Sequence, residues 1–302
     1  MSNIIFGPIN SRRFGSSLGI DLSPEKKQCN FDCVYCELRA FKPQKDFLLY
    51  PSVDEILSEV QKVLANQIQF DVLTLTANGE PSLYPFLNEL IAELNKIKKN
   101  KKLLILSNGS AVLNSKSYKA LLDIDMVKFS LDSAIEKTFC KIDRALKEIC
   151  IDDIIKQMIK FNKEFKGELI METLIVKGLN DKEEEMIALD KAFSKIKPLR
   201  VDLSTIDRPP AYPVKPIKFE RLYELSLLIH STPVVLAKHT YNNQEIDFTK
   251  DELLKMLKLR AQSELDIENR FSQFSKNNLK ELIKEQKIIS IDLAGIKFYK
   301  NT

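Results

Sequence analysis

Short apolar runs alternate with amphipathic stretches over about the first 230 residues. The runs are rich in valine, isoleucine and leucine, and they predict six strands, at residues 17–22, 72–76, 103–106, 127–131, 169–176 and 201–205. Between them, apolar residues recur every three or four positions and predict helices that begin after Ser52 and near residue 85 and that cover 118–122, 151–161, 183–193 and 219–229. Each helix is then a right-handed crossover that joins two parallel strands and covers one face of the sheet. The expected fold is therefore α/β, an open, partial (β/α)6 TIM-type barrel rather than a closed barrel of eight units.

The pattern changes after about residue 245. Three apolar helical stretches follow there, each introduced by a capping residue, at Thr249, Ser263 and Ser275. Residues 288–299 predict a hairpin with its turn at 294–295. Three helices and a hairpin in this order resemble a winged helix. We therefore expect a barrel domain at 1–235 and a small winged-helix-like C-terminal domain at 236–302.

The third of these helices carries side chains suited to phosphate contacts, namely Lys276, Asn277, Lys280, Lys284 and Lys287. Residues 250–302 nevertheless hold eleven basic and eight acidic side chains, a surplus of only three positive charges. Nucleic-acid contact is thus one of three interpretations of this region. The others are packing on the barrel and binding of a protein partner.

Composition narrows the class of protein. With 302 residues, 44% of them hydrophobic, the chain has enough apolar material for one large core and a smaller module. Its net charge of +4 does not by itself indicate a nucleic-acid binder. No apolar stretch approaches the roughly 20 residues that cross a bilayer, and Met1 opens onto no apolar leader. We expect a cytoplasmic protein with no membrane partner.

Cys29, Cys33 and Cys36 follow a CxxxCxxC spacing on a short polar segment. Three thiolates so spaced can bind three irons of a cubane [4Fe–4S] cluster and leave the fourth iron open for another ligand. Structural zinc is less favoured, because a second CxxC pair is missing and both histidines, His230 and His239, lie about 200 residues downstream. A disulfide framework does not suit five sparse cysteines.

The runs 7–13 and 19–21, together with the cysteine segment 29–37, resemble the opening of the radical S-adenosylmethionine (SAM) superfamily. The likeness covers about residues 5–230 and is nearest to a group distantly related to the enzymes that build the wyosine base on tRNA. It implies a [4Fe–4S] cluster on the three cysteines, SAM as second cofactor, and Tyr35 near its adenine. It also implies reductive cleavage of SAM to a 5′-deoxyadenosyl radical that abstracts hydrogen from a substrate, with flavodoxin or ferredoxin as reductant.

Polar residues follow the predicted strands, where chemistry sits in such barrels. Gly79 allows a close approach of the backbone to a ligand, and Glu80 offers a carboxylate to an ammonium group. The pair resembles the Gly-Gly-Glu element that holds the SAM amino group in the family, with Asn78 replacing the first glycine. Further candidates suit ribose hydroxyls or the SAM carboxylate, as similar positions do in the family: Asn108, Ser130 and Asp132. Ordinary turns between strand and helix are the alternative interpretation.

Two later residues complete the expected cofactor contacts. Glu172 interrupts an apolar strand, so its carboxylate should face either the barrel lumen or the sheet edge. Arg208 precedes two prolines that stiffen its loop, and it can meet SAM or an anionic substrate or form an ion pair with Asp207. Arg12 and Arg13 allow the same two interpretations.

Three functions remain open at this point. The first is a radical SAM enzyme that modifies RNA, a tRNA base for example, with the winged-helix-like domain holding the substrate. The second is a radical SAM enzyme that acts on a peptide or small molecule. The third is a non-catalytic iron–sulfur redox sensor that binds DNA. Gly79 and Glu80 count against it, because a sensor has no need of a SAM pocket. We adopt the first, and we expect Cys140 and Cys150 to be small buried residues without a role.

Overall fold

The computed structural model describes residues 4–11, 13–236, 247–259, 261–293 and 296–301. An eight-stranded sheet follows the order of the chain from β1 to β8. β1 (Ile5–Ser11) pairs antiparallel with β2 (Gly15–Asp21), and every later pair of neighbours is parallel. The later strands are β3 (Val72–Thr76), β4 (Lys102–Ser107), β5 (Met126–Ser130), β6 (Glu168–Ile175), β7 (Arg200–Thr205) and β8 (Val234–Leu236).

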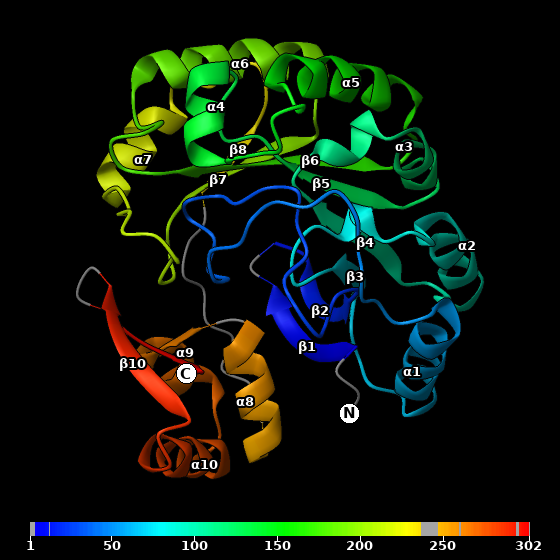
Figure 1. The fold of residues 1–302 in the computed structure, drawn as a ribbon, viewed down its shortest axis with the longest axis vertical. Helices are drawn as coiled ribbons and strands as arrows, with labels where there is room; N and C mark the ends of the chain where they lie inside the picture. The colour runs from blue at the N-terminus through cyan, green and yellow to red at the C-terminus, as the bar shows by residue number, and fades with distance from the viewer. Residues whose placement is uncertain (1–3, 12, 237–246, 260, 294–295, 302) are drawn as a thin grey trace.

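All six predicted strands are present, and β1 and β8 are additional. The connecting helices are α1 (Val53–Ala65), α2 (Leu87–Ile97), α3 (Ser115–Leu121), α4 (Glu136–Ile142), α5 (Ile151–Glu164), α6 (Glu183–Ile196) and α7 (Phe219–Ser226), with 3-10 turns η1 (Pro81–Leu83) and η2 (Ser110–Leu113). Helices cover the outer face of a curved sheet, and the segment between β2 and α1 crosses its inner side (Figure 1). Because the strand order starts at β1 and ends at β8, the barrel is open, as the sequence predicts.

The apolar positions that predict the elements are those that the fold buries. In α5, Ile154, Met158 and Phe161 are fully buried, and Phe161 stacks on Phe165 with 4.9 Å between ring centroids. Each such side chain contributes about 1.5–3 kcal/mol on burial. The predicted capping box at Ser52 is also present, since its hydroxyl accepts from the Glu55 amide and the Glu55 carboxylate accepts in return.

The tip of the β1–β2 hairpin closes the end of the barrel opposite the carboxyl ends of the strands. Phe14 packs there against Val72, Leu104 and Met126 from three successive strands. The neighbouring Arg13 consequently reaches into the lumen, where it meets carboxylates of β6 and β7.

The C-terminal region has its own buried cluster of apolar residues, which includes Leu253, Phe271 and Leu282. It consists of α8 (Lys250–Leu259), β9 (Gln262–Ser263), α9 (Glu264–Arg270), α10 (Gln273–Lys284), β10 (Ile288–Leu293) and β11 (Ile296–Asn301). The three strands form an antiparallel sheet in the order β10–β11–β9.

The three predicted C-terminal helices and the hairpin are therefore present, with one correction. The cap of α10 is Ser272 rather than Ser275, which lies inside the helix and is buried. The predicted turn at 294–295 lies outside the described residues. The likeness to a winged helix and the division at 235/236 stay predictions. Within the described ranges, no helix is both long and apolar enough to span a membrane.

Candidate active site

The cysteine loop, the segment that carries Cys29, Cys33 and Cys36 after β2, is fixed to the loop after β3 by backbone contacts. The Gln28 amide donates to the Asn78 carbonyl at 2.8 Å, and the Glu80 amide donates to the Gln28 carbonyl at 2.9 Å. Gly79 has φ +142°, and a Cβ there would lie 1.8 Å from the Gln28 oxygen. Only glycine therefore permits this contact. Asn78 takes part through its backbone, with its amide donating to Asp21 at 3.0 Å, so its side chain type is less constrained.

The three cysteines line one cavity of about 210 Å³ at the carboxyl ends of the strands. Six of the nine predicted cofactor contacts line the same cavity: Tyr35, Gly79, Glu80, Asn108, Ser130 and Glu172. These residues come from the cysteine loop, from the loops after β3 and β4, from the last residue of β5 and from within β6. The fold thus brings the predicted metal ligands and most of the predicted SAM contacts to one place.

The thiols are protonated groups with polar neighbours. Cys29 accepts from the Phe31 amide at 3.4 Å, Cys33 donates to Asp143 at 3.4 Å, and Cys36 accepts from the Lys27 ammonium at 3.6 Å. Burial raises the pKa of Cys29 to about 12 and also raises the pKa of Cys33 and Cys36, so binding iron must release their protons.

Among the described residues, no three Cys, His, Asp or Glu side chains converge as a single metal ion requires. A cubane makes a different demand, because each thiolate binds a different iron atom. Three cysteines around one cavity fit this demand.

Glu80 is a buried carboxylate that ends at the cavity. It accepts hydrogen bonds from the Asn108 amide at 2.7 Å and from the Ser82 amide at 3.0 Å. Burial raises the pKa of Glu80 in spite of these donors. A cation beside Glu80 would offset the cost of burying its negative charge. The ammonium group of SAM, the predicted partner, is such a cation. Asn108 also donates to Asn30 at 2.8 Å and lies 3.9 Å from the sulfur of Cys29.

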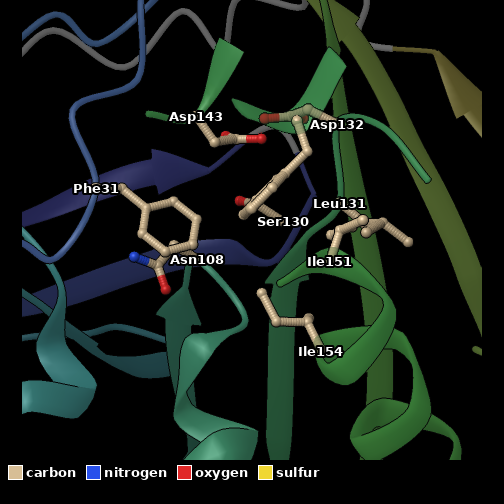
Figure 2. Close-up of a pocket in the computed structure, with 9 residues that line it drawn as sticks. Phe31, Asn108, Ser130, Leu131, Asp132, Asp143, Ile151 and Ile154 are labelled. Carbon is tan, nitrogen blue, oxygen red and sulfur yellow. The ribbon is translucent and has the colours of Figure 1, made fainter. Parts of the chain in front are cut away.

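Asp132 lies beside a smaller cavity of about 10 Å³, the size of one water molecule. Figure 2 shows the carboxylates of Asp132 and Asp143 at one end of it and the side chains of Ile151 and Ile154 at the other. Asp132 accepts from the Tyr35 hydroxyl at 2.5 Å and from the Leu174 amide at 2.7 Å. Burial raises the pKa of Asp132 to about 6. In the structure, Asp132 therefore orients Tyr35 and does not itself line the larger cavity.

Glu172 faces the barrel lumen, the first of its two predicted placements. It accepts from Arg13 at 2.5 Å and from Lys128 at 2.7 Å. Burial alone would raise the pKa of Glu172, but Lys128 and Arg13 hold it below its ordinary value. Lys128 also lies 3.2 Å from Asp202. Lys128 also lines the cavity and was not predicted. Its position inside an otherwise apolar strand could have indicated that it faces the polar lumen.

Arg208 does not line the cavity. Its guanidinium lies 3.7 Å from the carboxylate of Glu37, the residue after Cys36, and it donates to the Ala261 carbonyl at 3.5 Å. Its predicted contact with SAM stays a prediction, as does the cofactor role of each other residue.

The two remaining cysteines are not buried as expected, and their lack of a role stays a prediction. Cys140 is exposed and Cys150 half-buried, and each donates to the carboxylate of Glu136, at 3.2 and 3.3 Å. Their apolar neighbours Phe139 and Ile151 take the buried positions of these helices instead. His230 is exposed, and His239 lies outside the described residues.

The fold is an open parallel barrel, and the cavity at its strand ends is lined by three cysteines and a buried carboxylate. This is the architecture of a SAM-dependent radical enzyme. The chain matches the radical SAM superfamily over residues 27–189, more than half of its length, and it belongs to that superfamily. It is therefore a radical SAM enzyme, and its cofactors are a [4Fe–4S] cluster and SAM. The finer likeness to wyosine-base synthases stays a prediction.

Two relatives match this chain along almost its whole length. A UPF0026 protein of Helicobacter pylori strain J99 is 38% identical over 299 residues, which cover 98% of this chain and 97% of the relative. A UPF0026 protein of Methanocaldococcus jannaschii is 29% identical, with 98% and 95% coverage. The SAM-bound structure of Streptococcus suis SuiB has a TM-score of 0.56 at 15% identity, covering 70% of this chain and 49% of SuiB, which shows a shared fold.

Proposed function

We propose that this chain uses radical SAM chemistry to modify a base of an RNA substrate. The chemistry is supported by one cavity, which Cys29, Cys33, Cys36 and Glu80 line together. When bound there, the cluster and SAM supply a 5′-deoxyadenosyl radical that removes a hydrogen atom from the substrate.

The residues around the cavity have distinct tasks in this proposal. The three cysteines hold the irons, and Glu80 binds the SAM ammonium group, because a cation offsets the desolvation of its buried carboxylate. Lys27 beside Cys36 offsets part of the negative charge that the thiolates bring. Phe31 and Leu106 supply apolar walls that limit the access of water to the radical.

The RNA substrate is inferred from the C-terminal region. Lys276, Lys280 and Lys284 recur at every fourth position of α10 and therefore share one face, and the last two are exposed. The region lies next to the barrel mouth, because Ala261 accepts from Arg208 and the charge of Lys258 acts on Asp21 at the end of β2. In this proposal the lysines bind RNA phosphates, and the bound RNA extends to the cavity.

Anaerobic turnover tests the chemistry. Reconstituted protein given SAM and dithionite should release 5′-deoxyadenosine. Cys29→Ala should lose both iron and product, whereas Cys140→Ala, a cysteine outside the cavity, should keep both. An intact cluster that releases no 5′-deoxyadenosine would refute the enzyme and favour the redox sensor.

Retention of tRNA tests the substrate. Affinity should fall with salt, with a slope of about −0.7 to −0.9 per phosphate contact. Lys280→Glu with Lys284→Glu should weaken binding and flatten the slope. The matched control is Lys163→Glu with Lys191→Glu on the outer helices, also exposed lysines, which should change little. If no RNA is retained at low salt, the substrate is a peptide or small molecule instead.

A further inference from the structure

Residues 206–217, which we call the strap, join two distant parts of the barrel. The strap follows β7, whereas the cysteine loop follows β2, and four strands separate these two in the sheet. The Ala211 amide nevertheless donates to the carbonyl of Cys36 at 2.9 Å. Figure 1 shows the strap, in yellow-green, beside the blue cysteine loop on the inner side of the sheet.

Tyr212 connects the strap to Asp32, which lies between the first two cysteines. Its hydroxyl donates to one oxygen of Asp32, and the other oxygen accepts from the Phe41 amide at 3.1 Å and lies 3.7 Å from the Lys27 ammonium. The Asp32 amide donates to the Asp143 carbonyl. The guanidinium of Arg144 lies 4.3 Å from the centre of the Tyr212 ring. Asp32 is therefore one of the residues through which the cysteine loop is tied to its surroundings, and the one that Tyr212 contacts.

Arg208 makes a second connection, at the other end of the cysteine motif. It is 8% exposed, and its ion pair with Glu37 fixes the residue that follows Cys36. Its contact with the Ala261 carbonyl extends the connection to the C-terminal region.

The cysteine loop has little regular structure of its own to set the positions of its thiols. From Cys29 to Cys36 it holds no helix and only an isolated bridge at the preceding Gln28. Ordering such a segment costs about 1–2 kcal/mol for each residue, and contacts made by a neighbouring element offset this.

We propose that Tyr212 and Arg208 are positioning residues, through which the strap holds the cysteine loop in its cluster-binding form. The inference rests on the proposed function only for the identity of the cluster. The contacts themselves are made by the protein without it.

Hydrogen exchange of the metal-free protein, followed by mass spectrometry, tests the proposal. Tyr212→Phe keeps the ring and removes the donor to a carboxylate, so the amides of residues 28–44 should exchange about tenfold faster. Arg208→Lys keeps the charge but removes the planar fork and should do the same. Tyr223→Phe, an exposed tyrosine on α7, is the matched control and should change nothing. Amides of β3 to β6 should keep their rates in all variants.

Asp32→Asn provides a second test. If Tyr212 acts through Asp32, the Tyr212→Phe and Asp32→Asn double variant should exchange no faster than the faster single variant. In reconstituted protein, Tyr212→Phe and Arg208→Lys should also release iron to a chelator severalfold faster and shift the midpoint potential of the cluster.

Unchanged exchange in residues 28–44, additive effects in the double variant, or faster exchange throughout the barrel would each overturn the proposal. Failure to cleave SAM would refute the proposed function but would leave the exchange result standing. The two ideas therefore fail separately.

Discussion

Gly79→Ala is the substitution whose effect the geometry defines most closely. The new methyl group would lie 1.8 Å from the oxygen, 2.4 Å from the carbon and 2.9 Å from the nitrogen of Gln28, all of them backbone atoms. To bring the oxygen to 3.0 Å, the cysteine loop must retreat by at least 1.2 Å, the difference between the two distances. That retreat breaks the two backbone hydrogen bonds of Gln28, to Asn78 and from Glu80.

The energetic consequence follows from these contacts. A residue with a side chain at φ +142° is strained by about 1–3 kcal/mol. Each lost hydrogen bond adds about 0.5–1.5 kcal/mol. The sum is about 2–6 kcal/mol, and it falls on the loop that carries Cys29. We therefore expect the variant to bind less than about a third of the iron of the native protein and to have a lower midpoint of thermal unfolding.

Iron and sulfide per chain after anaerobic reconstitution, together with thermal unfolding followed by circular dichroism, measure both effects. Gly178→Ala is the matched control, since Gly178 also has positive φ, +76°, but its Cβ would meet nothing within 4 Å. It should show the strain and keep its iron. If Gly79→Ala binds as much iron as Gly178→Ala, the contact with Gln28 does not hold the cysteine loop.

Three further predictions test the charges. Burial raises the pKa of Asp21 from 3.8 to about 6. The native carboxyl therefore keeps its proton where the unfolded chain has lost it, and stability should fall by about 3 kcal/mol as pH rises from about 4 to about 6. Asp21→Asn can still accept from Ser23 and Asn78, so its urea midpoint should lack this slope; an equal slope would contradict the assignment. Lys128→Met leaves Glu172 and Asp202 with less compensating charge and should lower the free energy of unfolding by about 3 kcal/mol. The exposed pair of Lys102 and Glu168 is the control, and Lys102→Met should lower the free energy of unfolding by less than about 1 kcal/mol. If both variants lose the same free energy of unfolding in urea, the charges in the barrel lumen have no special role in stability. Glu80→Gln should retain the cluster and weaken SAM binding about tenfold in calorimetry, and unaltered affinity would remove Glu80 from the SAM site.

Local patterns account for what the sequence predicts correctly. Apolar runs and helical periodicity record which face of each element is buried, so the six βα units and the open barrel can be predicted from them. The cysteine spacing and the polar residues at the strand ends also lie within short segments. Because parallel strands all end at the same edge of the sheet, residues as far apart as Glu80 and Ser130 could be assigned to one cavity in advance, whereas Tyr35 was placed there by the family resemblance.

Only the tertiary structure decides which partner each polar side chain finds. Tyr212 and Asp32 are 180 residues apart and Arg13 and Glu172 are 159 apart, and no periodicity within either segment specifies such a pair. Arg208 turns to Glu37 for the same reason, and Cys140 becomes exposed because Phe139 takes the inward position of its short helix. Local sequence determines the elements and the edge at which chemistry occurs. The contacts that hold the cysteine loop depend on how distant elements meet, and that is decided only when the chain closes around its core.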